Sequence, residues 1–377
     1  MIKELLLIRK FYRQVNTSGN YLFFPFYHVG GAETVHLNIL RTFQEKPNCF
    51  ITNKSFSDAN RPSFQKYSNL IEIEPLTRTG KYRKYLLKSI ARRINHDKNP
   101  VVFGCNSIFF YDLIPMLKSH VWIADLTHAF SYEQYSPEFY SLPVANRFNA
   151  RIVLGQKTKE DYANLYKDHG IDSKYTERIN IIKNNVYVPD SLVKPKNNIL
   201  QIVFVARNSP EKRPEIVFEI LRRLNQDGIP FQCTIVGDFD QLNLQIDYAK
   251  FTGEIHNKAT LQNVYLNSDV LLLTSEREGL PMVILEAMAH QVLPISTAIG
   301  EISELKRAEP GIILSESLEP EAVISEMLKI IRHLNENKSE LRIRQKNCYH
   351  TVKENYSTEK FTDSYRKLFH KILPQNQ

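Results

Sequence analysis

The fold of this chain is indicated most clearly by one stretch of its sequence, Val270-Leu-Leu-Leu-Thr-Ser-Glu-Arg-Glu-Gly-Leu-Pro-Met-Val-Ile-Leu-Glu-Ala-Met-Ala289. It opens with an apolar, β-favouring run, which predicts a buried strand. In the loop that follows, Gly279 allows the backbone to approach a ligand closely, and Pro281 suits the first position of a helix. The mostly apolar residues after Pro281 predict a buried helix. A strand, a short loop and a helix in this order form the repeating unit of a parallel α/β sheet.

Two glutamates in this stretch are candidate functional residues. Glu278 is expected in the loop at the carboxyl end of the strand, beside a helix N-terminus that favours a phosphate or a hydroxyl group. Glu286 is expected about one and a half turns into the helix, among apolar neighbours that limit its contact with water. A carboxylate can accept paired hydrogen bonds from the hydroxyls of a sugar ring. The alternative is that both glutamates are charges facing water without a ligand.

The segment from Glu278 to Ala289 resembles the signature of the family-4 retaining glycosyltransferases, which have the GT-B fold. Further segments resemble that family in order and spacing: Ala206-Arg-Asn-Ser-Pro-Glu-Lys212, His28-Val-Gly-Gly-Ala-Glu33, Val236-Gly-Asp238, Phe251-Thr-Gly253 and Ile299-Gly-Glu301. The resemblance spans residues 21–314 and is strongest in the second half. Ala206 and His290 depart from the pattern, since the family usually has glycine at both positions.

Chain length agrees with the fold that the resemblance implies, because 377 residues fit two domains. The expected α/β architecture is GT-B, with two Rossmann-like doubly wound domains, a cleft between them, and a C-terminal helix that returns to the first domain. The expected parts are an acceptor-side domain at 1–195, a donor-binding domain at 196–357 and the returning helix at 358–377. A linker is expected at the proline-containing polar residues 189–198.

Strand-then-helix order in both halves predicts two parallel sheets covered on both faces. The strands expected in the first half are 21–24, 49–52, 70–73, 101–104, 121–124 and 152–154. The strands expected in the second half are 200–205, 232–236, 270–274, 293–296 and 311–314. The helices expected there are 214–224, 261–266, 281–289, 321–334, 339–356 and 358–373.

The resemblance implies a role for each charged candidate. Arg207 and Lys212 would neutralise the negative charge that develops on the diphosphate leaving group of a nucleotide-sugar donor. Both follow the end of one expected strand, so both could reach one site. Glu278 would hold hydroxyls of the transferred sugar, and Glu286 would hold the hydroxyls of the ribose.

Backbone groups are expected to complete the donor site. By the same resemblance, N–H groups near Gly279 and Leu280 would face the sugar and the diphosphate. Gly30 and Gly31 would bring the backbone of the first domain against the diphosphate and the acceptor, because side chains there would block close approach.

His128 is the remaining catalytic candidate, because family members often have a histidine in this region near the transferred sugar. It follows an expected strand of the first domain. Two alternatives stay open: His128 is a loop or packing residue, or Asp125 in the same loop takes the role.

No metal and no cofactor is expected beyond the donor substrate. Asp238-Phe-Asp240 has the spacing of a metal-binding acid pair in the other major glycosyltransferase fold, but its place at a strand end of the second domain favours an ordinary loop pair. The four cysteines are isolated in sequence, which predicts buried free thiols in a reducing cytoplasm and argues against structural zinc.

Positive charge is concentrated in the first half, where residues 1–195 carry 27 Lys and Arg against 17 Asp and Glu. Residues 78–93 contain no acid and place apolar residues on one helical stripe between cations. The segment is either a solvated surface helix, an anionic membrane face or, ranked lowest for want of a motif, a nucleic-acid site. No apolar run reaches the roughly 18 residues of a transmembrane helix. The expected location is the cytoplasm, peripheral to the inner membrane face if the basic segment binds there.

Taken together, the sequence predicts a retaining hexosyltransferase that moves a sugar from a nucleotide-diphosphate sugar, by family frequency a UDP-sugar, to an acceptor hydroxyl. The acceptor would be a saccharide or a lipid-linked molecule in cell-surface polysaccharide or glycolipid synthesis. Two alternatives remain: a GT-B sugar-nucleotide epimerase, and a catalytically silent glycan-binding scaffold on the same fold. The joint presence of Arg207, Lys212, Glu278 and Glu286 argues against the silent scaffold.

Overall fold

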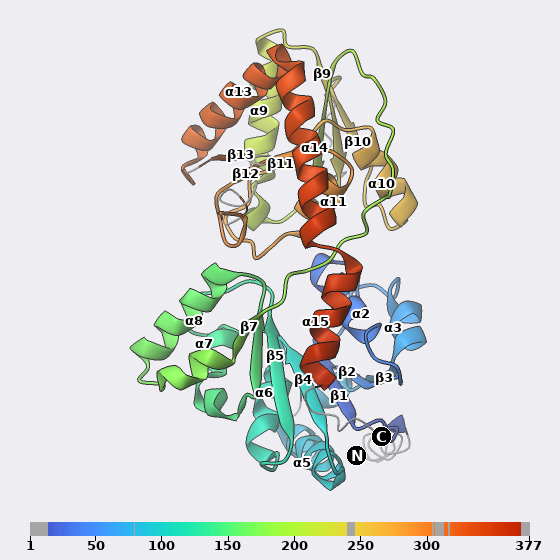
Figure 1. Cartoon of the computed structure of the whole chain (residues 1–377), viewed down its shortest axis with the longest axis vertical. Coiled ribbons are helices and arrows are strands. Elements are labelled where there is room, and N and C mark those ends of the chain that lie inside the picture. Colours follow the sequence, from blue (N-terminus) through green and yellow to red (C-terminus); the bar gives the residue numbers. More distant parts are fainter. Residues whose placement is uncertain are drawn as a thin grey trace. The chain divides into compact units, whose positions relative to one another are not determined.

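The computed structural model describes residues 14–78, 80–239, 246–303, 305, 313–315 and 317–370 of the chain. It divides into two compact units (Figure 1). The first unit is Met1–Lys183 with Phe361–Gln377, and the second is Asn184–Lys360. The sequence placed the corresponding boundaries at 195/196 and 357/358, so the expected linker falls inside the second unit.

Side-chain contacts explain why the linker belongs to the second unit. The Tyr349 hydroxyl donates a hydrogen bond to the Pro189 carbonyl at 2.6 Å. The Lys194 ammonium group donates to the carbonyl of Gln291 at 2.7 Å and to that of Ser268. Burial lowers the pKa of Lys194 to about 8. A buried ammonium group needs such acceptors, and they attach the segment to its own unit.

The first unit contains a seven-stranded parallel sheet in the order β3-β2-β1-β4-β5-β6-β7. Its strands are β1 (Asn20–Phe24), β2 (Asn48–Ile51), β3 (Asn69–Glu72), β4 (Val101–Cys105), β5 (Trp122–Thr127), β6 (Ala150–Val153) and β7 (Ile179–Ile181). Every residue of β1, β2 and β4 is buried, as expected of strands covered on both faces. The sequence did not predict β7, because this short edge strand has two exposed residues and no apolar run.

Helices cover this sheet and connect its strands (Figure 1). They are α2 (Gly31–Leu40), α3 (Arg61–Tyr67), α4 (Glu74–Thr77), α5 (Gly80–His96), α6 (Ile108–Leu113), α7 (Pro137–Tyr140) and α8 (Gln156–Asp168). The last helix, α15 (Thr358–His370), also contributes from Phe361 onward. Tyr365 and Phe369 contact Phe103 of β4 edge to face, with ring centroids 6.3 and 5.8 Å apart. The C-terminal helix therefore packs on the first unit, as the resemblance implied.

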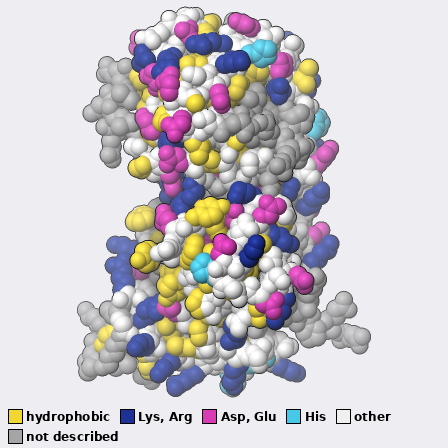
Figure 2. All heavy atoms as spheres, turned by 90° about the vertical axis from the view of Figure 1, so that its left-hand side faces the viewer, with side chains coloured by type: hydrophobic (Ala, Val, Ile, Leu, Met, Phe, Trp, Pro, Cys, Tyr) yellow, Lys and Arg dark blue, Asp and Glu magenta, His cyan; other side chains and the backbone are white. Residues whose placement is uncertain are grey.

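The basic helix α5 is an amphipathic surface helix whose apolar stripe faces the core of the first unit. Its apolar residues Leu86, Ile90 and Ile94 are buried in the main hydrophobic core of the first unit. The expected apolar stripe is thus used in folding, and it is not available to insert into a membrane. Its polar face carries exposed cations, and Figure 2 shows Lys and Arg side chains gathered at the end of the first unit where Figure 1 places α5.

The second unit contains a six-stranded parallel sheet in the order β10-β9-β8-β11-β12-β13. Its strands are β8 (Leu200–Val205), β9 (Phe231–Val236), β10 (Ala249–Phe251), β11 (Val270–Leu273), β12 (Leu293–Thr297) and β13 (Ile313–Ser315). Its helices are α9 (Pro214–Gln226), α10 (Lys258–Leu266), α11 (Met282–Ala289), α13 (Pro320–Glu336) and α14 (Lys338–Asn355). The short strand β10 was not predicted. Among the described residues, no helix combines the length and the apolar character needed to span a membrane.

Strand order reverses direction beside the first strand of each unit, at β1 and β4 in one and at β8 and β11 in the other. In an open α/β sheet, the loops at the carboxyl ends of such neighbouring strands form the usual ligand crevice. The predicted site residues follow β1 and β5 in the first unit, and β8 and β11 in the second.

Candidate functional site

The loop after β11 places Glu278 beside a lysine from the loop after β8. Lys212 Nζ lies 2.5 Å from Glu278 Oε1, and both side chains are largely buried. The Ser275 hydroxyl donates a second hydrogen bond to the same oxygen at 2.8 Å. Sequence reasoning placed Lys212 and Glu278 in one site, and the structure brings them into direct contact. Neighbouring β8 and β11 are paired, which explains how loops 66 residues apart meet.

Arg213 holds this arrangement together, and sequence reasoning missed it. Its backbone adopts the left-handed conformation at φ 49°, and its side chain is buried. The guanidinium donates to the carbonyls of Thr274 and Leu318, each at 2.6 Å. The Thr274 hydroxyl in turn donates to the Lys212 carbonyl at 2.8 Å. These bonds fix the β8 loop against the end of β11, and so they fix Lys212 beside Glu278.

Arg207 has a different environment from Lys212. Its side chain is 71% exposed and lies 3.5 Å from Glu211, which also lies 3.7 Å from Arg277. A long, exposed and weakly paired guanidinium loses little on leaving this partner, because such surface ion pairs contribute little stability. The structure therefore leaves Arg207 able to turn toward an anion bound at the loop.

Glu286 lies on α11 and is half-buried, as expected from its apolar neighbours. The Tyr265 hydroxyl, from α10, donates a hydrogen bond to Glu286 Oε2 at 3.1 Å. Burial raises the pKa of Glu286 to about 7, whereas the Tyr265 hydrogen bond and the charge of Lys258 act to lower it. The helix begins at Met282 with Pro281 in an extended conformation just before it, one residue later than predicted.

A tight turn at Gly300 lies against the backbone of the Glu278 loop. Gly300 has φ 51°, and a Cβ atom there would come within 2.0 Å of the Glu278 carbonyl oxygen. The Glu301 N–H donates to the Gly279 carbonyl at 3.2 Å. The Leu280 carbonyl accepts a bond from the Asn184 amide at 3.5 Å. Close backbone packing at Gly300 thus shapes the loop, and the close approach of a ligand to Gly279 stays a prediction.

Asp238 connects the ends of β8 and β9. Its carboxylate accepts a hydrogen bond from the Asn208 N–H at 2.6 Å. This contact gives Asp238 a structural role in the loop that carries Arg207. The other acid of the pair, Asp240, lies outside the described residues.

In the first unit, Gly30 and Gly31 stand at the N-terminus of α2. A Cβ atom on Gly30 would come within 2.2 Å of Glu33 Oε2, so the Glu33 carboxylate occupies the space that a side chain would need. Glu33 also lies 3.4 Å from His28. The acid in the first helical turn is favourable next to the helix N-terminus, as predicted.

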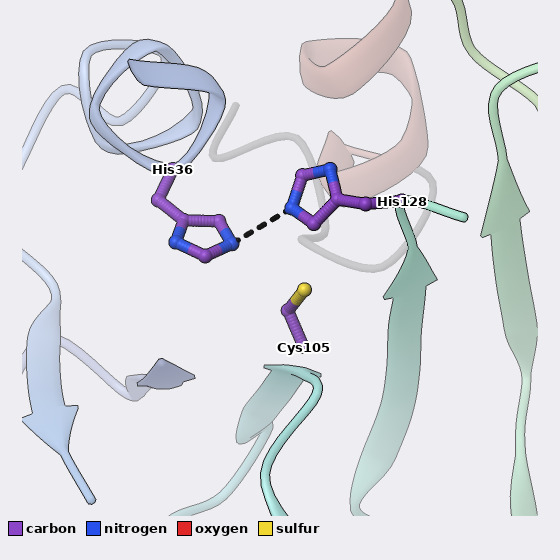
Figure 3. A group of neighbouring side chains, drawn as sticks. All are labelled: His36, Cys105 and His128. Carbon is purple, nitrogen blue, oxygen red and sulfur yellow. Dashed lines mark hydrogen bonds between the residues drawn. The ribbon is translucent and has the colours of Figure 1, made fainter. Parts of the chain in front are cut away.

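His128 follows β5 and pairs with another histidine that sequence reasoning did not single out. Its Nε2 lies 2.9 Å from Nε2 of His36 on α2 (Figure 3). Burial lowers the pKa of His128 to about 4 and holds the pKa of His36 well below its usual range, the latter with help from His128 and His28. Both imidazoles are therefore neutral at physiological pH, and the N–H of one ring donates a hydrogen bond to the bare nitrogen of the other.

The alternative prediction placed Asp125 in the same loop as His128, and that placement is wrong. It lies within β5 and is fully buried against Arg151, with the Arg151 guanidinium 2.7 Å from its carboxylate. Arg151 also bonds the hydroxyls of Tyr166 and Ser141, at 3.1 and 2.8 Å. A buried ion pair with its bonds satisfied in this way is a structural element of the first unit.

Comparisons with known proteins agree with the fold. Residues 200–333 match the family model described as glycosyl transferases group 1. The N-acetyl-alpha-D-glucosaminyl L-malate synthase of Bacillus anthracis is 29% identical over 247 residues, which cover 64% of this chain and 57% of the relative. The putative colanic acid biosynthesis glycosyltransferase WcaL of Escherichia coli K12 is 28% identical over 131 residues, covering 31% of this chain and 32% of the relative. The matched segments thus cover only about half of the first relative's length and about a third of the second's.

Among solved structures, Anabaena Alr3699/HepE in complex with UDP-glucose superimposes with a TM-score of 0.71 at 16% identity, covering 93% of this chain and 99% of that one. At this identity the likeness concerns the fold alone. Two Rossmann-like units with parallel sheets define the GT-B glycosyltransferase class. The predicted resemblance to that class is confirmed, and residues 200–333 match the model of the glycosyl transferases group 1 family.

Proposed function

We propose that this chain is a retaining glycosyltransferase that transfers a sugar from a UDP-sugar to an acceptor hydroxyl. The contact between Lys212 and Glu278 carries the proposal, because a cation and a carboxylate lie side by side at the end of β11, and we assign the cation to the diphosphate and the carboxylate to hydroxyls of the transferred sugar. A donor diphosphate would accept hydrogen bonds from Lys212 and from the N-terminus of α11, and Arg207 would turn onto it from the same β8 loop. No metal is proposed at the diphosphate, since these groups supply positive charge.

Glu286 is proposed to bind the ribose of the donor. Its half-buried carboxylate has one hydrogen-bond donor in Tyr265, and an ionised carboxylate has lone pairs for further hydroxyls. In the first unit, Gly30 and Gly31 are proposed to approach the diphosphate and the acceptor, and His128 is proposed to lie near the transferred sugar.

The names of the relatives bear on the donor and the acceptor. Alr3699/HepE is solved with UDP-glucose, which supports UDP as the nucleotide. The relatives are named for an L-malate glucosaminide and for colanic acid biosynthesis, which supports acceptors ranging from a small hydroxy acid to a growing polysaccharide or glycolipid. We place the protein in the cytoplasm, with the basic helix α5 facing an anionic membrane when the acceptor is lipid-linked.

Release of UDP from a panel of UDP-sugars, with and without acceptors, tests the proposal. A transferase should release UDP only in the presence of the correct acceptor, apart from slow hydrolysis. Conversion of the donor to another sugar nucleotide without an acceptor would instead identify an epimerase. A protein that is not stabilised against heat by any UDP-sugar would be a silent scaffold, since a bound ligand raises the free energy of unfolding.

A further inference from the structure

Three potential metal ligands meet at the carboxyl edge of the first sheet. His36 comes from α2, Cys105 ends β4, and His128 follows β5. One ligand atom from each, an imidazole nitrogen or the thiol sulfur, lies within 4.8 Å of those of the other two. Figure 3 shows the two imidazoles and the sulfur turned toward one shared space. Residues that are 69 and 23 positions apart have no motif spacing, which is why the sequence did not reveal the cluster.

We propose that His36, Cys105 and His128 form a Zn²⁺ site. Neutral imidazole and thiolate are the ligands that zinc prefers, and a site with three protein ligands keeps a fourth position for a water or another oxygen. His36 and Cys105 are buried and His128 is half-buried, so the open position would face the side of His128.

The surroundings hold these ligands in place and favour a cation. The His36 ring stacks on Phe24 at the end of β1, with centroids 4.1 Å apart and the planes 5° from parallel. Cys105 ends β4 and His128 follows β5, and these two strands are paired neighbours in the sheet. The Glu33 carboxylate acts electrostatically on the Cys105 sulfur, and negative charge there stabilises a bound ion, whereas the charge of Asp125 is offset by Arg151.

Binding exchanges a proton for the ion without any redox step. The hydrogen bond between the two Nε2 atoms is replaced by two nitrogen–zinc bonds, and the imidazole that donated that bond moves its proton to Nδ1. The Cys105 thiol releases its proton to water and binds through the thiolate. The inference does not rest on the proposed glycosyl transfer, because its evidence comes from the first unit alone, although His128 serves in both proposals.

The full-length protein is stripped of metal and titrated with Zn²⁺ in competition with a chromophoric chelator, and separately with Co²⁺. The expected result is one tight Zn²⁺ equivalent and a Co²⁺ spectrum with a thiolate charge-transfer band. Cys105→Ala should abolish that band and weaken Zn²⁺ binding on the order of a hundredfold or more. Cys49→Ala is the matched control, since Cys49 is also a buried strand cysteine of the first unit, and it should bind like the natural protein.

The natural protein alone can overturn the inference, even if the variants fail to fold. Binding of Co²⁺ without a thiolate band, or the absence of tight Zn²⁺ binding, would leave His36 and His128 as a hydrogen-bonded pair. None of these measurements involves donor turnover. The zinc site can therefore be rejected while the transferase stands, and a failed UDP-release assay leaves the metal titration unaffected.

Discussion

The Tyr265 hydroxyl lies 3.1 Å from Glu286 Oε2, and this contact joins two neighbouring helices of the second unit at the proposed ribose site. Tyr265 is buried, and its ring stacks on His290, whose Nδ1 lies 2.7 Å from the Glu286 carbonyl. His290 stands where the resembled family usually has glycine. The stacking fixes the Tyr265 ring, and the ring fixes one oxygen of Glu286. In the proposed site, the other oxygen would accept a ribose hydroxyl.

Glu286→Gln is expected to weaken binding of the donor. The amide keeps the shape of the side chain, but it cannot accept two hydroxyl hydrogen bonds as a carboxylate does, so the affinity should fall by roughly 1–3 kcal/mol. Calorimetric titration with UDP measures the change. Glu336→Gln, at the exposed end of α13, is the control. An unchanged affinity in the Glu286 variant would assign Glu286 to the structure of α11 alone.

The raised pKa of Glu286 also predicts how stability depends on pH. The folded protein holds this proton up to a pH of about 7, whereas the unfolded chain loses it near the ordinary value of 4.5. Folding therefore binds a proton in this window, and the contribution of Glu286 to the free energy of unfolding falls as the pH rises from about 4.5 to about 7. Glu286→Gln should remove this fall, on the order of 1–3 kcal/mol. Urea unfolding of the natural protein and of Glu286→Gln, at pH 4.5 and pH 8, measures this change in the free energy of unfolding. The same change in both proteins would contradict the raised pKa of Glu286.

Lys212→Ala and Arg207→Ala are each expected to lower turnover on the order of a hundredfold or more, because each removes positive charge from the departing diphosphate. The rate of UDP release under saturating donor measures the effect. Lys174→Ala and Arg222→Ala are the controls, since these cations pair with Asp172 and Glu219 on surfaces away from the proposed site. Near-normal turnover in either folded site variant would remove that residue from the mechanism.

The sequence predicted the fold well because strand-then-helix patterning is a local property. All eleven predicted strands were found, with ends shifted by no more than three residues. The two strands of the described residues that were missed, β7 and β10, are edge strands of three residues without an apolar run. The contact between Lys212 and Glu278 was also within reach. Both residues follow strand ends, and the carboxyl ends of neighbouring parallel strands share one edge of the sheet.

Side-chain partners contributed by distant segments were not predictable. The sequence does not show that Arg213 fixes the β8 loop. Its neighbour Lys212 carries the same charge, so the two cations cannot be told apart by residue type. The pairing of His36 with His128 joins residues 92 positions apart. The apolar stripe of α5 was predicted correctly, but its burial was not, since periodicity does not tell whether a core or a membrane covers an apolar face.

Transfer is expected to require no added Mg²⁺ or Mn²⁺, since Lys212, Arg207 and the N-terminus of α11 supply positive charge at the diphosphate. UDP release is measured after removal of metal ions and again after each ion is restored singly. Activity that returns with Mg²⁺ or Mn²⁺, but not with Zn²⁺, would place a metal at the diphosphate. Asp238→Asn would then distinguish a ligand role from the structural bond to Asn208, because asparagine can still accept that bond.

Arg151→Met is expected to destabilise the first unit by about 3–5 kcal/mol, because it leaves the Asp125 carboxylate buried without its partner. The double variant Asp125→Leu/Arg151→Met should recover part of this loss, since it removes the unpaired charge as well. Urea unfolding of the single and double variants measures the coupling. If the single and the double variant lose the same free energy of unfolding, the ion pair itself provides the stability.

The exposed cations of α5 provide the test of membrane binding. With the apolar stripe buried in the core, only electrostatic attraction is available, at about 1 kcal/mol for each Lys or Arg near an anionic surface. Lys84, Lys88 and Arg92 are exposed and recur at intervals of four, so they share one face of the helix. Replacing all three with Glu should abolish sedimentation with anionic vesicles, which in the natural protein should weaken steeply with salt.

Replacing Arg342, Lys346 and Lys353 of α14 with Glu makes the same charge change on the second unit and should leave sedimentation largely intact. Equal binding to neutral and anionic vesicles, or none at low salt, would make α5 a solvated surface helix and would favour a soluble acceptor.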